Sequence, residues 1–168
     1  MEWHMSRLGE GRHLSSAIFN LSALLVAATL ASYGDAMARR LSESFRVRFR
    51  GLIWVMALAL AGVALFPFDE FPVIHNVFGY SFFFATGILM VWSALKVSDF
   101  SRRSDYIAVT AAVVTFGLML MHHLLHMTTL LTVEVIGELL LFTWLMSIAM
   151  DVELGRNALT VSSRGSSR

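Results

Sequence analysis

Five long apolar runs, separated by short segments that hold most of the charges, make up most of the chain. A bilayer core about 30 Å thick is crossed by a helix of about 20 apolar residues, so runs of that length bounded by charge predict membrane spans. Five runs meet this description: Leu14 to Tyr33, Gly51 to Phe68, Val73 to Val97, Tyr106 to Met127 and Leu130 to Met150. The pattern predicts an all-α protein, a polytopic membrane helix bundle with five transmembrane helices.

Composition agrees with this fold class and excludes several others. Of the 168 residues, 57% are hydrophobic and 15% are charged, whereas a soluble domain has about 45–50% apolar residues. The chain contains no cysteine, which excludes disulfides and thiolate metal sites. We expect one transmembrane domain over residues 1–150 and a cytoplasmic tail over 151–168, disordered from Thr160 to Arg168 because that end is rich in Ser, Arg and Gly.

The distribution of Lys and Arg predicts the orientation. Eleven of the thirteen basic residues lie in or at the edge of the first connection, the third connection and the tail, whereas the second and fourth connections have none. Short loops rich in Lys and Arg stay in the cytoplasm, so we expect a multi-pass protein of the cell membrane with its N-terminus outside and its C-terminus in the cytoplasm. The clustering also argues against a nucleic-acid partner. The five arginines after the first run favour its retention as a span over removal as a signal peptide.

Polar residues collect at the outer ends of the predicted spans. Glu134 and Glu138 lie roughly 6 and 12 Å below the outer start of the fifth span. A charge in mid-membrane costs about 2.5–3.5 kcal/mol even on the mildest insertion scale, so these carboxyl groups should face protein or a wet cavity. The same end also holds Asn20, Asp69, Glu70, His75, Asn76, His122, His123 and His126.

A divalent metal site is one interpretation of this cluster. His122 and His126 share one helical face, as do Glu134 and Glu138, and His75 could complete the set. Nitrogen and oxygen ligands of this kind suit Zn, Fe, Mn or Cu. No complete metal-binding signature is present. A hydrogen-bonded polar cap is an alternative, and a proton, quinone, haem or lipid-headgroup site is another.

Two sequence segments resemble a known family. Met5-Ser-Arg-Leu-Gly-Glu-Gly11, followed by Ser15-Ser-Ala-Ile-Phe-Asn20, and Leu65-Phe-Pro-Phe-Asp69 leading to Ile74-His-Asn76, are similar to the bacterial membrane family catalogued as domain of unknown function 998. The resemblance implies a six-helix bundle whose first span is missing here or supplied by a partner. It also implies a shared outer-face feature that consists of Ser6, Arg7, Glu10, Asn20, Asp69, His75 and Asn76.

Three functions are compatible with the sequence. The first is an integral membrane subunit or interaction protein, whose partners would be the lipid bilayer and other membrane subunits or further copies of the chain. The alternative is a metal-dependent hydrolase or oxidoreductase acting on a lipid or apolar substrate at the outer leaflet. A transporter or proton relay is disfavoured because the inner half of every span has almost no polar residue. We prefer the first.

Overall fold

The computed structural model of this protein describes residues 14–96 and 100–165, with side chains described for 16–96 and 100–154. Over these residues the fold is all-helical and has five helices: α1 (Leu14–Ala38), α2 (Glu43–Leu65), α3 (Pro72–Lys96), α4 (Arg102–Leu125) and α5 (Leu130–Gly165). Each of the five contains a segment long and apolar enough to cross a membrane. The predicted fold class is confirmed.

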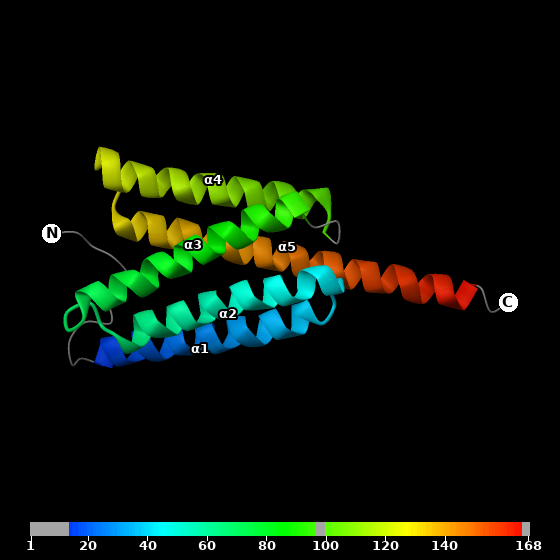
Figure 1. The fold of residues 1–168 in the computed structure, drawn as a ribbon, viewed down its shortest axis with the longest axis horizontal. Coiled ribbons are helices and arrows are strands. Elements are labelled where there is room, and N and C mark those ends of the chain that lie inside the picture. The colour runs from blue at the N-terminus through cyan, green and yellow to red at the C-terminus, as the bar shows by residue number, and fades with distance from the viewer. Residues whose placement is uncertain (1–13, 97–99, 166–168) are drawn as a thin grey trace.

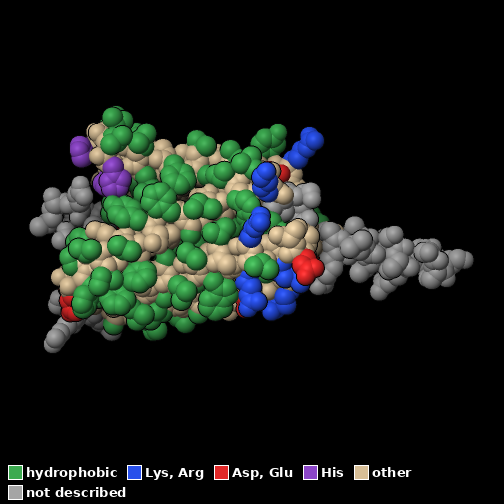
Figure 2. Space-filling model, in the orientation of Figure 1, with side chains coloured by type: hydrophobic (Ala, Val, Ile, Leu, Met, Phe, Trp, Pro, Cys, Tyr) green, Lys and Arg blue, Asp and Glu red, His purple; other side chains and the backbone are tan. Residues whose placement is uncertain are grey.

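The helices run up and down in sequence order (Figure 1). The closest packing is between helices that are consecutive along the chain. The connections after α1 and α3 lie at one end of the bundle, and those after α2 and α4 lie at the other. Described Lys and Arg side chains gather at the first of these ends, and exposed histidines at the second (Figure 2). We call them the basic end and the histidine end.

At the basic end, the helices extend further than the predicted spans. The predicted connection between Tyr33 and Gly51 contains the last residues of α1 and the first two turns of α2. The Arg46 side chain donates hydrogen bonds to the carbonyls of Ala38 (3.2 Å) and Leu41 (3.4 Å). Basic side chains favour the unpaired carbonyls at a helix C-terminus, so Arg46 stabilises this tight turn. At the other end of the chain, α5 continues to Gly165, into the segment predicted as a tail.

At two contacts between helices, a glycine of one helix faces a phenylalanine ring of the next. Small residues let membrane helices approach closely. A Cβ atom at Gly62 on α2 would collide with the Phe78 ring of α3, and one at Gly87 on α3 would collide with Phe116 of α4. The core beside these contacts contains the fully buried side chains of Phe49, Ile53, Met56, Leu89, Trp144 and Ile148. This packing fixes α2, α3 and α4 relative to one another.

Candidate functional site

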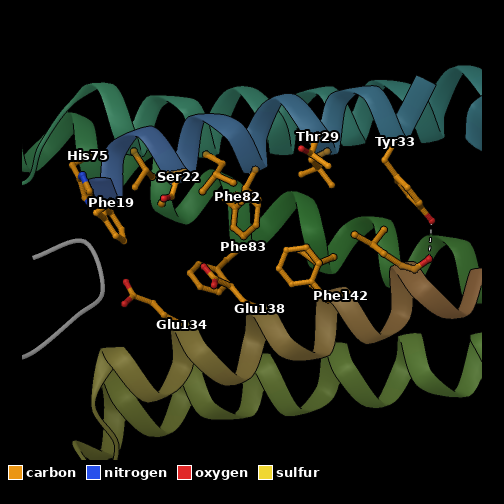
Figure 3. A pocket seen from close by; sticks show the side chains of 18 of the residues that line it. Phe19, Ser22, Thr29, Tyr33, His75, Phe82, Phe83, Glu134, Glu138 and Phe142 are labelled. Atoms are coloured by element: carbon orange, nitrogen blue, oxygen red, sulfur yellow. Dashed lines mark hydrogen bonds between the residues drawn. The ribbon is translucent and has the colours of Figure 1, made fainter. Parts of the chain in front are cut away.

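A cavity of about 470 Å³ lies between α1 and α5, with residues of α2 and α3 behind it (Figure 3). Its lining is mostly apolar. It contains Phe19, Ser22, Ala23, Val26, Thr29, Leu30, Tyr33, Leu60, Val63, His75, Gly79, Phe82, Phe83, Glu134, Glu138, Leu141, Phe142, Leu145 and Met146. Since Glu134 and Met146 both line it, the cavity follows α5 for about 18 Å. A long apolar cavity with few polar groups is typical of a ligand site.

The two glutamates enter this cavity from α5. Their spacing of four residues puts both carboxyl groups on one helical face, and Figure 3 shows both directed toward α1. The sequence predicted that both carboxyl groups would face protein or a cavity, and both line this cavity. Glu138 is half-buried and forms no hydrogen bond or ion pair with another described residue. A carboxyl group in such surroundings has lost water without gaining a protein partner among the described side chains, which costs free energy.

Close packing at Gly137 fixes the position of the α5 turn that carries Glu138. A Cβ atom at this position would lie 3.2 Å from the Phe83 ring of α3 and 3.3 Å from Thr115 of α4. Neighbouring helices therefore approach α5 closely at Gly137. This contact places the carboxyl-bearing turn of α5 directly beside Phe83, which also lines the cavity.

His75 lines the cavity near the histidine end. Its ring is buried, and its Nδ1 lies 2.9 Å from the Phe66 carbonyl oxygen. A carbonyl oxygen only accepts, so Nδ1 carries the proton and donates. In the neutral ring this leaves Nε2 as an acceptor. The Phe68 ring packs edge-on against the imidazole, with ring centroids 5.7 Å apart.

Tyr33 lines the cavity toward the basic end. Its hydroxyl donates a 2.7 Å hydrogen bond to the Leu145 carbonyl oxygen of α5, drawn as a dashed line in Figure 3. This contact joins α1 directly to α5. His75 and Tyr33 thus mark the two ends of the cavity, and Phe82 and Phe142 lie between them.

The predicted metal ligands are divided between two places. His75, Glu134 and Glu138 line the cavity, whereas His122 and His126 do not. His122 is buried, with Nδ1 2.9 Å from the Thr128 carbonyl, and so ties together the α4–α5 hairpin. His126 ends α4 in a left-handed conformation with φ 53°. Within the described part of the chain, no group of three or more His, Cys, Asp or Glu residues is arranged to hold a metal ion. Metal binding by this set stays a prediction from sequence.

The other residues singled out in the sequence lie around the cavity rather than in it. Asn20 is half-buried on α1, and Asp69 and Asn76 are exposed at the α2–α3 connection. His123 is exposed, and its Nε2 lies 3.5 Å from the Tyr80 hydroxyl. Ser6, Arg7 and Glu10 lie outside the described residues.

Sequence reasoning missed a polar network near the basic end. The Asp151 carboxylate accepts hydrogen bonds from the Ser101 amide (2.9 Å) and the Ser104 hydroxyl (2.6 Å), and Ser104 also contacts Ser147. Ser101, Ser104 and Asp151 lie just beyond the predicted spans, where hydropathy gave no reason to expect a network. Ser101, which caps α4 by accepting from the Ser104 amide, was the available signal, because Ser is a preferred residue at a helix start. The network fastens α4 to α5.

Residues 15–147 match the family of unknown function DUF7103. The chain belongs to this family. The resemblance to domain of unknown function 998 is therefore wrong, and the missing first span inferred from it loses its basis. The motifs that suggested it are short, and one of them serves a common structural purpose: Pro67 and Pro72 flank the turn between α2 and α3, where the missing amide hydrogens of proline are tolerated. No curated protein and no solved structure matches the chain.

Proposed function

We propose that this DUF7103 protein is a multi-pass membrane protein that binds one amphiphilic molecule of lipid class in the cavity between α1 and α5. The observation that carries the proposal is the Glu138 carboxyl group, which enters a long apolar cavity without a described protein partner. An amphiphile would place its polar group near Glu138 and its apolar chain along the remaining lining.

The size of the cavity favours a small molecule over a partner helix. A membrane-spanning helix about 10 Å across and about 30 Å long occupies on the order of 2,000 Å³, several times the 470 Å³ of the cavity. Ligand sites for single small molecules have volumes of about 300–1,000 Å³. The cavity therefore suits a small molecule with a single alkyl chain.

The lining also favours entry from the side of the bundle. Five of the lining residues, Ser22, Val26, Thr29, Phe142 and Met146, are exposed on the surface of the described molecule. They belong to the two helices that flank the cavity, within segments apolar enough to lie in the bilayer. The opening between α1 and α5 thus faces the hydrocarbon region, where an amphiphile is already dissolved.

The orientation proposed from sequence puts the glutamate-bearing half of this cavity in the outer leaflet. Its support is the segregation of charge, since described Lys and Arg side chains gather at the end of the bundle that holds the first and third connections (Figure 2). The sequence hypotheses of a membrane-complex subunit and of a metal-dependent enzyme stay predictions.

A cavity-filling substitution tests the proposal. Gly79 lines the cavity, and a Cβ atom there would have nothing within 4 Å, so Leu in Gly79→Leu can grow into the space without a backbone clash. Gly117 on α4 has equally open surroundings and does not line the cavity, which makes Gly117→Leu the matched control. Native mass spectrometry of the purified proteins should find one amphiphile per chain in the wild type and Gly117→Leu, and a strong loss in Gly79→Leu. Equal occupancy in all three proteins, or no bound amphiphile in the wild type, would contradict the proposal.

A further inference from the structure

The chemistry of the cavity lining distinguishes between classes of amphiphile, and this inference rests on the proposed function. Glu134 and Glu138 are the acidic residues among the described lining, which includes no Lys or Arg. The described Lys and Arg side chains gather at the basic end (Figure 2), whereas Glu134 lies in the second turn of α5, which begins at the histidine end. The phosphate of an ordinary phospholipid would meet like charge here, and like charges brought together in an apolar region are strongly unfavourable.

Aromatic rings surround the turn that carries Glu138. Phe83 packs against Gly137, the residue next to Glu138, and Phe82 and Phe19 also line the cavity. Figure 3 shows these rings near the glutamate-bearing part of α5 and on the helices opposite it. Ring faces attract ammonium groups, most strongly where water is excluded. A carboxylate with neighbouring aromatic rings is suited to an ammonium group.

His75 does not change this conclusion. Its Nδ1–H is directed to the Phe66 carbonyl, so its remaining ring nitrogen is an acceptor in the neutral form. His75 and the two glutamates therefore offer acceptors to a ligand. A positively charged donor or a quaternary ammonium group complements them, whereas a second acceptor does not.

We infer that the amphiphile bound in this cavity is a lipophilic cation, an ammonium group on a single alkyl chain, with the ammonium beside Glu138 and the chain directed along α1 and α5 toward Tyr33. The charge of Glu138 gives the selectivity, and the apolar lining gives most of the affinity. Anionic lipid headgroups are excluded from the same position.

Binding of dodecyltrimethylammonium tests this assignment. The matched probe is its uncharged analogue with carbon in place of nitrogen, which has the same shape. Both are radiolabelled and equilibrated with the full chain in nanodiscs of zwitterionic lipid, and empty nanodiscs supply the background. We expect saturable binding of one cation per chain, with the analogue bound at least about tenfold more weakly, as for the loss of one interaction with a charged group.

Variants at Glu138 separate charge from shape. Glu138→Gln should weaken the cation about tenfold and leave the analogue unchanged, while Glu138→Asp, which keeps the charge, should retain the preference for the cation. Gly79→Leu should reduce binding of both probes, and Gly117→Leu should reduce neither. If the Gln variant does not fold, the inference is still tested by whether the wild type and Glu138→Asp bind the cation more tightly than its analogue.

Three results would overturn the inference. Equal binding of the cation and its analogue, or a preference that survives Glu138→Gln, would show that the cavity selects shape and not charge, and the proposed amphiphile site would stand. Absence of saturable binding of either probe, together with no bound amphiphile in the purified wild type, would remove both the inference and the proposed function.

Discussion

The Tyr33 hydroxyl on α1 donates a 2.7 Å hydrogen bond to the Leu145 carbonyl oxygen on α5. The two residues lie in the first and last of the described helices, 112 positions apart in sequence. Both line the cavity. The bond therefore limits how far α1 and α5 can separate at the basic end of the cavity.

Loss of this hydrogen bond should loosen the bundle. Tyr33→Phe removes the donor and keeps the ring, and a hydrogen bond of this kind contributes about 0.5–1.5 kcal/mol to the free energy of unfolding. We expect a decrease of that size, measured by denaturant unfolding of the purified protein in a mild detergent. Tyr106→Phe is the control, because Tyr106 is 72% exposed on α4. An equal effect of the two substitutions would show that the Tyr33 bond does not stabilise the bundle.

The glycine contact between α2 and α3 gives a second prediction. Gly62→Ala puts a Cβ atom against the Phe78 ring, which must move, so we expect a loss of about 1–3 kcal/mol in the free energy of unfolding. Gly51→Ala on the same helix meets nothing within 4 Å and should be neutral or stabilise by up to about 1 kcal/mol. Thermal unfolding of both variants measures the difference. If Gly62→Ala is as stable as Gly51→Ala, close packing at this position is not required.

The orientation can be tested with single cysteines, because the chain has none of its own. Glu70 and Arg39 are exposed at opposite ends of the bundle, in the second and first connections. With the N-terminus outside, a membrane-impermeant maleimide should label Glu70→Cys in intact cells and label Arg39→Cys only after lysis. The reverse pattern would show that the positively charged loops are outside.

The number and position of the helices could be predicted from sequence, but their ends could not. Hydropathy reports which residues can lie in the hydrocarbon region, and a helix can continue beyond it. Asp35 on α1 shows the difference, since its carboxylate accepts hydrogen bonds from the Arg50 (2.7 Å) and Trp54 (3.1 Å) side chains of α2. With its charge paired, Asp35 is tolerated within a helix that continues to Ala38.

The candidate site was only partly predictable, for a different physical reason. Glu134 and Glu138 were expected to face protein because charge is costly in lipid, and they do line a cavity. Which helices would face them could not be read from sequence, because these helices are apolar on most of their surface and periodicity does not mark a buried face. His122 therefore appeared equivalent to His75, although one closes a hairpin and the other lines the cavity. In the sequence, Phe82 and Phe83 are indistinguishable from ordinary packing residues, and nothing marks them as lining a cavity.

The exposure of Phe142 (47%) and Met146 (66%) on the side of α5 has a consequence for how occupancy is regulated. A site with its entrance in the hydrocarbon region exchanges with molecules already in the membrane. Its occupancy then depends on the mole fraction of ligand among the lipids rather than on the aqueous concentration. A molecule almost insoluble in water could saturate the site, and a change in membrane composition alone could empty it.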